Sequence, residues 1–366
     1  MKKATNATSM KEKNKKLILH IISQKECSRA DISRITGLTK AAVTMIIDEL
    51  ISEGYVEEYT SDYVGVGRKP IYLKLRENSA YAIGVNITRK KYEVGIVNLC
   101  GDIVISEEFA IAKPKEAIDK IKATISEQIK ATDIENEKIL GIGITTPGPV
   151  NYKENTILNP PNFSAWHNLK FDFSPSIRLE NIANAAALAE KYFGKCIDTE
   201  NYIMITVDEG IGSGIIVDNK IYRGNSGRGN EVGHISIDYN GRVCECGNVG
   251  CLEKYASIPS ILDGTGYSLW KEVIDNADAA LITQEAGYLS FAITTVVNLF
   301  DISSILLSGD IAYKGEILAT EIKKKVLNSS LNKDEINIIP ARQKSGIVIA
   351  ASTVIDEFFT KEDDIS

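Results

Sequence analysis

A glycine-rich stretch at residues 230–255 constrains this chain most, because it gathers a histidine and three cysteines. It reads NEVGHISIDYNGRVCECGNVGCLEKY, and its candidate metal ligands are His234, Cys244, Cys246 and Cys251. Three thiolates and one imidazole can surround one tetrahedral Zn²⁺ in a closed structural site. A disulfide pair or three unconnected buried cysteines are the alternatives, but three cysteines leave one unpaired, and nothing else here indicates an oxidising compartment. The spacing therefore predicts a structural zinc site.

The order of residues in this stretch resembles the signature of the ROK family of sugar kinases and sugar-responsive repressors. The pattern is E-x-G-H followed by C-x-C-G-x-x-G-C-x-E, and here it runs from Glu231 to Glu253. In that family the zinc folds the loop against a sugar pocket. The resemblance implies that Glu231, Glu253 and His234 reach sugar hydroxyls, the histidine through its second ring nitrogen. A metal on one nitrogen would fix the orientation and tautomer of that ring.

Size and composition indicate a multidomain globular protein. A chain of 366 residues is too long for one typical core, so two or three domains are expected. Its 44% apolar and 25% charged residues are ordinary for a soluble protein. Without an apolar run near 18 residues or a signal-peptide core, we expect a cytoplasmic protein with no membrane partner. The other cysteines, Cys27, Cys100 and Cys196, are expected to be reduced core residues.

Charge is distributed unevenly along the chain. Residues 1–80 carry 14 Lys and Arg against 10 Asp and Glu, whereas the remainder carries 28 against 39. Within residues 1–47 the balance is 10 against 3, a net charge of +7. A basic N-terminal part on an acidic body suggests that only the N-terminal part meets a polyanion.

The N-terminal sequence has the pattern of a helix-turn-helix. After a polar tail to about Met10, a helix is predicted from about Glu12 to Gln24. A short helix capped by Ser28 and a second helix capped by Thr39 follow, with a glycine turn between them. The apolar positions of the last helix fall on one face, as an amphipathic helix requires; they are Val43, Ile46, Ile47, Leu50 and Ile51. In this arrangement the last helix enters the major groove of DNA.

Two strands around a polar turn follow Gly54 and are typical of a wing. In that turn, Gly67-Arg68-Lys69-Pro70 resembles the GR-x-P element of ROK repressors. Lys40 and Thr44 suit phosphate and base-edge contacts. A helical protein-interaction module is the alternative, but the wing, the local charge and the attached body favour DNA binding. The expected DNA contacts are Arg29, Thr39, Lys40, Ala41, Thr44, Arg68 and Lys69.

From Tyr81 onward the pattern changes to β-branched strands with turns between them. Three strands, a helix and a fourth strand precede Pro147, and two strands around a glycine-rich turn follow at residues 200–222. The resemblance implies that these begin two lobes. The expected α/β fold is an N-terminal winged helix-turn-helix, residues 1–78, followed by a two-lobed ribonuclease-H/actin-like sugar-kinase fold. We call residues 79–366 the body; its last helix is expected over residues 345–358.

The family's kinase chemistry is missing from this chain. Its catalytic base is the aspartate of an N-D-x-N segment, and Ile182 stands at that position here. An isoleucine cannot accept a proton, and loss of a general base costs about 10²–10⁴ in rate. The first phosphate motif, D-x-G-G-T, is replaced by the residues from Asn86 to Lys90, and the adenosine-side G-G-G by Ser308-Gly309-Asp310. Only the phosphate turn at residues 210–214 is kept, so we expect a binding protein and no enzyme.

The sugar side of the family site is better preserved. Carboxylates and amides suit a polyhydroxyl ligand because each donates or accepts in fixed directions. Retention of these residues only to support the zinc loop is the alternative. The resemblance implies the following sugar-binding residues: Gly148, Asn162, Asn181, Glu231, His234 and Glu253.

These features together resemble ROK transcriptional repressors, in particular those of the xylose-repressor kind. The expected partners are operator DNA and a small sugar inducer, with a homodimer or higher homo-oligomer on a palindromic operator. An active ATP-dependent sugar kinase with a DNA-binding domain is one alternative. A zinc-stabilised scaffold that binds a protein partner is the other.

Overall fold

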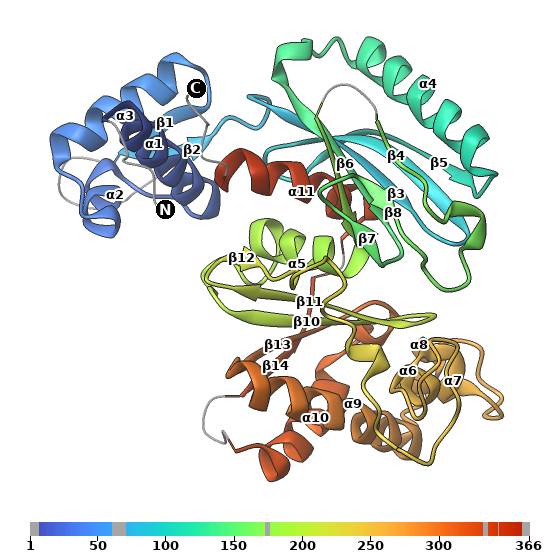
Figure 1. Cartoon of the computed structure of the whole chain (residues 1–366). Helices are drawn as coiled ribbons and strands as arrows, with labels where there is room; N and C mark the ends of the chain where they lie inside the picture. Colours follow the sequence, from blue (N-terminus) through green and yellow to red (C-terminus); the bar gives the residue numbers. More distant parts are fainter. Residues whose placement is uncertain (1–6, 61–70, 173–175, 332–335, 343, 361–366) are drawn as a thin grey trace. The chain divides into compact units, whose positions relative to one another are not determined.

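The computed structural model of the chain describes residues 7–60, 71–172, 176–331, 336–342 and 344–360 (Figure 1). It divides into two compact units. The first unit combines Met1–Ile144, Asp172–Arg178 and Gly346–Ser366, and the second combines Thr145–Phe171 and Leu179–Ser345. This division groups the N-terminal domain with the first sheet of the body. The predicted boundary at residue 78 therefore stays a prediction.

The N-terminal domain is a winged helix-turn-helix, as predicted. Its elements are α1 (Ala7–Gln24), α2 (Arg29–Thr36), α3 (Lys40–Ser52), β1 (Val56–Thr60) and β2 (Ile71–Leu75). The strands β1 and β2 pair antiparallel, and Cys27 adds an isolated bridge to Leu73. The turn between them, with Arg68 and Lys69, lies outside the described residues.

Local capping fixes the helix-turn-helix. Ser28 and Asp31 form a reciprocal capping box at the start of α2, with 3.2 Å from the Asp31 N–H to the Ser28 hydroxyl oxygen. The Thr39 hydroxyl accepts a hydrogen bond from the N–H of Ala42 at 3.2 Å, which caps α3. Between them Gly37 ends α2 with a φ of 71°, a conformation that favours glycine. The predicted caps are therefore confirmed.

The predicted start of the first helix is wrong. α1 begins at Ala7, before the expected Glu12. Its first turns are held against α3 by ion pairs that periodicity does not reveal, because both Lys11 and Lys15 contact Glu49. The apolar face of α3 is confirmed at Val43, Ile46, Ile47 and Leu50, which are buried, whereas the fifth predicted position, Ile51, is half-buried.

The first sheet of the body has the order β5-β4-β3-β6-β9. Its strands are β3 (Tyr81–Ile87), β4 (Lys91–Asn98), β5 (Ile103–Ala110), β6 (Ile139–Thr146) and β9 (Ile177–Asn181). Helix α4 (Pro114–Thr132) and the 3-10 turn η1 (Asn136–Lys138) connect β5 to β6. The strands β3, β4 and β5 form an antiparallel meander. This is the predicted run of three strands, a helix and a fourth strand.

The C-terminal helix α11 (Gly346–Thr360) packs on this sheet within the first unit. A Cβ atom on Gly84 of β3 would lie 2.1 Å from the carbonyl oxygen of Ile347, so glycine permits this close approach. The far end of α11 contacts the N-terminal domain. The ring of Phe359 lies 5.4 Å from that of His20 on α1, and the ring of Phe358 lies 5.8 Å from that of Tyr55. α11 thus touches both the sheet and the DNA-binding domain.

The second unit contains a sheet of the same relative strand order, β12-β11-β10-β13-β14. Its strands are β10 (Tyr202–Val207), β11 (Ile211–Val217), β12 (Lys220–Ile221), β13 (Ser304–Ser308) and β14 (Asn337–Pro340). β10 pairs antiparallel with β11 and parallel with β13, which pairs parallel with β14. Three meander strands followed by two crossover strands thus occur in both units, the repeat expected of a two-lobed actin-like body.

Helices and short turns complete the second unit. The helices are α5 (Ile182–Phe193), α6 (Glu253–Ala256), α7 (Ile258–Leu262), α8 (Trp270–Asp275), α9 (Ala279–Phe300) and α10 (Glu316–Ser329). The hairpin strands β7 (Val150–Asn151) and β8 (Thr156–Ile157) and the 3-10 turn η2 (Ser164–Trp166) precede α5, and two further 3-10 turns, η3 (Val232–His234) and η4 (Asp310–Ala312), come later in the chain. Trp166 is buried and stacks on Phe163.

Helix α9 is a core element of this unit. Ile282, Leu289 and Ile293 on it are buried in the hydrophobic cluster that also contains β10 and β13 side chains. By length and composition alone it is the one helix, within the described ranges, apolar enough to cross a membrane. Core helices pass the same test, and 44% of its apolar window is buried inside this unit.

Of the three cysteines outside the 230–255 loop, one differs from expectation in its burial. Cys27 and Cys196 are buried, as predicted, and burial raises the pKa of their thiols to about 11 and about 12. Cys100 is exposed, so its assignment to the core is wrong. It lies in the turn from β4 to β5, beside Leu99, and there the leucine and not the cysteine is buried.

Candidate functional site

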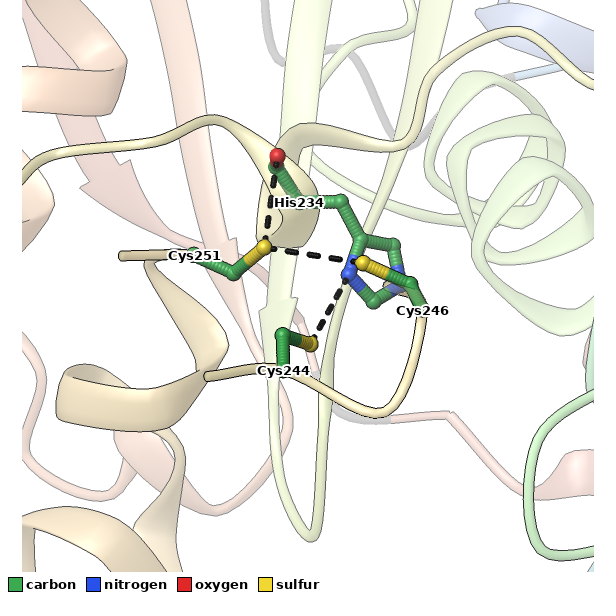
Figure 2. A group of neighbouring side chains, drawn as sticks. All are labelled: His234, Cys244, Cys246 and Cys251. Carbon is green, nitrogen blue, oxygen red and sulfur yellow. Dashed lines mark hydrogen bonds between the residues drawn. The ribbon is translucent and has the colours of Figure 1, made fainter. Parts of the chain in front are cut away.

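The histidine and three cysteines of the 230–255 loop come together in the second unit. Their donor atoms all lie within 4.8 Å of one another, and Figure 2 shows the four side chains directed toward a common centre. The Cys244 Sγ lies 3.7 Å from His234 Nδ1, and the Cys246 and Cys251 Sγ atoms lie 3.6 Å apart. All six cysteines of the chain are free thiols.

The spacing of these donors fits a tetrahedral metal ion. With Zn–S bonds of about 2.3 Å and a Zn–N bond of about 2.0 Å, tetrahedral ligand atoms lie about 3.5–3.8 Å apart. The measured separations of 3.6 Å and 3.7 Å fall in this range. A disulfide would need the sulfurs at about 2.05 Å. The loop is thus folded around a site that could hold a metal, as the sequence predicts.

The surrounding loop is braced so that these donors face inward. Isolated bridges join Ser236 to Cys251 and Val243 to Val249 across the loop. The Arg242 guanidinium lies 4.9 Å above the ring of Tyr255 and donates to the carbonyl of Lys254 at 2.7 Å. Without a metal, burial raises the pKa of the Cys251 thiol to about 12, and the neighbouring thiols add to the rise. A metal would have to displace those protons, since it binds thiolates.

Three of the predicted sugar-binding residues gather at the first residue of β11. Glu231 precedes the turn η3 and His234 is its last residue. A Cβ on Gly233 would lie 2.3 Å from the Ile211 carbonyl oxygen, so η3 rests directly on β11. The Glu253 Oε2 accepts a hydrogen bond from the Ile211 N–H at 2.8 Å. The structure therefore brings both glutamates and the metal-facing histidine to one point.

Electrostatics support the closeness of these groups. Burial raises the pKa of Glu231; His234 opposes the rise, and Glu253 adds to it. Glu231 is nevertheless exposed to solvent. A carboxylate that is accessible to a ligand and partly desolvated forms stronger hydrogen bonds than one in bulk water. With Nδ1 facing the cysteines, His234 keeps its Nε2 atom for another partner.

A second pair of predicted sugar-binding residues meets at the start of α5. The Asn181 Oδ1 accepts a hydrogen bond from the Ala183 N–H at 2.8 Å and caps the helix. A Cβ on Gly148 would lie 2.1 Å from Asn181 Nδ2, so only glycine lets the amide lie there. This pair adjoins the first group, because a Cβ on Gly212 of β11 would lie 3.0 Å from the Ala183 Cβ.

The remaining candidate, Asn162, is exposed in the loop before η2, with a φ of 56°. Its contribution to a sugar site stays a prediction. Ile182 is the first residue of α5 and is half-buried beside Asn181. Its side chain offers no proton acceptor at this position.

One acidic residue that sequence reasoning missed lies at the retained phosphate turn. Asp208 follows β10, and its Oδ1 accepts a hydrogen bond from the Asp310 N–H at 2.6 Å. A Cβ on Gly309 would lie 2.4 Å from the same oxygen. The carboxylate of Asp208 thus occupies the N-terminus of η4, where backbone N–H groups favour an anion. Burial raises its pKa, and the bond from Asp310 opposes that rise.

The predicted DNA-contacting side chains of α3 are free of the protein core. Thr39, Lys40, Ala41 and Thr44 are exposed at the N-terminal end of α3. Recognition helices contact base edges with these N-terminal residues. Met45 adds an apolar side chain to the same end, 54% exposed.

Arg29 differs from the other predicted DNA contacts. Its guanidinium binds Asp48 at 2.7 Å and Glu58 at 2.9 Å, and it donates to the Thr44 carbonyl at 3.2 Å. These bonds tie α2 to α3 and to β1. Arg29 therefore braces the recognition helix in this structure, and contact with DNA by its side chain stays a prediction. Arg68 and Lys69, also predicted contacts, lie outside the described residues.

Comparisons with known proteins agree with this geometry. Residues 82–357 match the ROK family, and residues 14–65 match the MarR family. The chain is 31% identical to the xylose repressor of Bacillus spizizenii over 375 residues, covering 93% of this chain and 96% of the repressor. It is 28% identical to the glucokinase of Thermotoga maritima, covering 74% of this chain and 96% of the kinase.

A solved structure extends the likeness to the whole chain. The crystal structure of a ROK family transcriptional regulator, a homolog of the E. coli MLC protein, superposes with a TM-score of 0.77. The two are 26% identical, and the match covers 96% of this chain and 97% of that chain. The regulators thus match the chain almost end to end, whereas nearly the entire glucokinase matches only three quarters of it.

Proposed function

The chain belongs to the ROK family, and we propose that it is a sugar-responsive transcriptional repressor. Its N-terminal domain binds operator DNA, and a sugar inducer bound in the body releases it. One observation carries this proposal: a winged helix-turn-helix with an exposed recognition end on α3 precedes, in one chain, a body whose carboxylates and amides converge at β11. The xylose repressor of Bacillus spizizenii and the ROK family transcriptional regulator of solved structure both match nearly the whole chain, which supports the proposal.

We propose Zn²⁺ as the metal of the loop, held by His234, Cys244, Cys246 and Cys251. The donor separations and the three soft thiolates suit zinc in a closed structural site. A bound zinc would fix the His234 ring and the fold of the 230–255 loop. These residues then hold η3 against β11 and leave Nε2 of His234 for a sugar hydroxyl.

The sugar inducer is proposed to contact Gly148, Asn162, Asn181, Glu231, His234 and Glu253. Two carboxylates, an imidazole and amides give acceptors and donors in fixed directions, which suits a polyhydroxyl ligand. Because the matched Bacillus protein is a xylose repressor, D-xylose is the first sugar to test. For DNA, the proposed contacts are Thr39, Lys40, Ala41 and Thr44, with Arg29, Arg68 and Lys69 beside them.

The body is proposed to be a degenerate kinase without turnover. Ile182 cannot serve as the general base, and Asp208 places a carboxylate on the N–H of Asp310, which repels phosphate. The active kinase and the protein-binding scaffold remain the competing functions. We further propose a cytoplasmic homodimer on a two-fold symmetric operator, because helix-turn-helix dimers read paired half-sites.

The test uses the full-length protein and DNA from the region upstream of its own gene. Fluorescence anisotropy measures binding of the DNA with D-xylose, D-glucose or N-acetylglucosamine added, and a coupled assay measures ADP. A repressor loses DNA affinity with one of these sugars and forms no ADP. Sugar-dependent ADP formation would select the kinase, and a protein that responds to none of the sugars would select the scaffold.

A further inference from the structure

An ion pair with a buried carboxylate adjoins the candidate sugar residues without belonging to them. The carboxylate of Glu180, at the end of β9, is 3% exposed. Its Oε2 accepts from Arg223 Nε at 2.6 Å, and its Oε1 accepts from the Asn181 N–H at 3.0 Å and from Asn184 Nδ2 at 2.9 Å. Both oxygens of this carboxylate are therefore engaged, and one of its donors is the backbone of a predicted sugar-binding residue.

The Arg223 side chain extends this contact to the hairpin that follows Gly148. Its guanidinium lies 4.8 Å from the centre of the Tyr152 ring, between β7 and β8. The loop beyond Arg223 rests on the same hairpin, since a Cβ on Gly227 would lie 2.9 Å from the Val150 carbonyl oxygen. Arg223 thus connects Glu180 to the hairpin that follows Gly148.

Asn184 extends the contact in the other direction, toward Glu231. Its Oδ1 accepts a hydrogen bond from Asn230 Nδ2 at 3.1 Å, and Asn230 also donates to the Tyr222 carbonyl at 2.6 Å. The Asn230 carbonyl accepts from the Ser213 hydroxyl at 2.7 Å. Asn230 directly precedes Glu231, so the same network fixes the backbone position from which the Glu231 side chain extends.

We infer that Glu180 and Arg223 are positioning residues of the sugar site, which hold the segments of Gly148, Asn181 and Glu231 in one mutual geometry. The inference rests on the proposed sugar-binding function. Burying an ion pair contributes little to stability in general, because desolvation offsets the attraction. A hydrogen-bonded network around a buried carboxylate does, however, lock directions that a sugar needs, and preorganisation of this kind raises affinity.

The test is a double-mutant cycle on sugar binding by the full-length protein. Glu180→Gln removes the charge but keeps an acceptor for Asn181 and Asn184, and Arg223→Met keeps an apolar stem over Tyr152 but no donor. Calorimetry with D-xylose, D-glucose and N-acetylglucosamine first identifies the sugar that the wild type binds. Each single substitution should then raise the Kd for that sugar by about tenfold or more. The double variant should raise it by no more than the more damaging of the two single substitutions.

Lys314→Met is the matched control. Lys314 pairs with Asp275 at 2.7 Å and lies 5.3 Å from the centre of the Tyr313 ring, so its loss removes an ion pair and a ring contact without touching this network. Its sugar Kd should stay within about twofold of the wild type, as for substitutions at independent sites. Arg223→Lys, which keeps the charge, should lie between wild type and Arg223→Met and serves if the latter does not fold.

Three results would overturn the inference. Lower melting temperatures with unchanged sugar Kd in the single variants would show that the pair only supports the fold. Additive losses in the double variant would show that the two residues act separately. A wild type that binds none of the three sugars at millimolar concentration would remove the sugar-sensor proposal, and this inference with it.

Discussion

Single side chains decide whether the body binds a metal or performs chemistry. The four donors of the 230–255 loop lie at separations that suit a tetrahedral ion, and their geometry comes from residues close in sequence. The kinase question depends instead on what is missing or replaced: Ile182 has no acceptor, and Asp208 occupies η4. Both features favour the proposed sensor over a catalyst.

Replacing one cysteine of the cluster should release the metal. Cys246→Ser removes a thiolate from a site in which metal binding and loop folding are coupled, so both metal content and stability should fall. At a free zinc concentration of 1,000 times Kd the ion would stabilise the fold by about 4 kcal/mol. Elemental analysis of the purified protein and thermal unfolding measure this. The control is Cys100→Ser, another exposed cysteine; equal zinc in wild type and Cys246→Ser would contradict the assignment.

Restoring the catalytic base should not restore a kinase. Ile182→Asp returns a carboxylate to the start of α5, but the substitutions at Thr88 and Arg89 and the Asp208 carboxylate on η4 remain. Each lost stabilising donor costs about 2.7–4 kcal/mol in the transition state. A coupled assay with ATP and the sugar panel should therefore detect no ADP above the blank. Turnover in Ile182→Asp alone would show that the nucleotide site is still competent.

Helices and strands were predictable where their signals are local. The caps at Ser28 and Thr39 and the buried face of α3 follow from residues three or four apart, and the structure confirms them. The start of α1 was missed because its first turns are stabilised by Glu49, far along the chain.

The same limit explains what sequence reasoning missed around the site. Glu180 meets Arg223, and Asp208 meets Asp310, across separations of 43 and 102 residues. The strand β9 reads IRLEN and carries a second charged residue, Arg178, so its sequence carries no signal that Glu180 in particular is buried. No periodicity within one element pairs it with its partner. Arg29 was likewise assigned by its position in the helix-turn-helix, and its acidic partners Asp48 and Glu58 became evident only in three dimensions.

The exposed end of α3 should carry much of the DNA affinity. Lys40→Ala removes a cation from the recognition end without disturbing the Thr39 cap, so operator affinity should fall by about 1–3 kcal/mol if the lysine contacts a base. If Lys40 contacts a phosphate, the slope of the logarithm of the affinity against the logarithm of the salt concentration should also become smaller by about one. The matched control is Lys323→Ala, an exposed lysine on α10 in the other unit. Equal losses in both variants would point to a nonspecific charge effect.

The whole chain joins a DNA-binding domain and a sugar-binding body, so its response depends on coupling between them. A sugar shifts a two-state repressor only if it prefers the state that does not bind DNA, since equal affinity for both states shifts nothing. Within the first unit, α11 contacts both the sheet and the N-terminal domain, through Ile347 at one end and Phe358 and Phe359 at the other. This helix is one described element through which the first sheet and the N-terminal domain can affect each other.

Loss of one sugar contact should separate inducer response from DNA binding. Glu231→Gln keeps the size of the side chain but removes the negative charge beside His234 and Glu253, where the sugar is proposed to bind. Hydrogen bonds to charged groups contribute about 1.5–3 kcal/mol, so the inducer concentration for half-release of DNA should rise about tenfold or more. DNA affinity without sugar should not change, because Glu231 lies in the second unit and not in the N-terminal domain.

The control is Glu245→Gln in the same loop, whose carboxylate pairs with Lys254 at 2.9 Å and faces no proposed sugar contact. Anisotropy titrations with the operator and the active sugar compare the three proteins. An unchanged inducer response in Glu231→Gln would mean that the sugar site is not at the start of β11, whereas a weaker response in both variants would indicate damage to the metal loop.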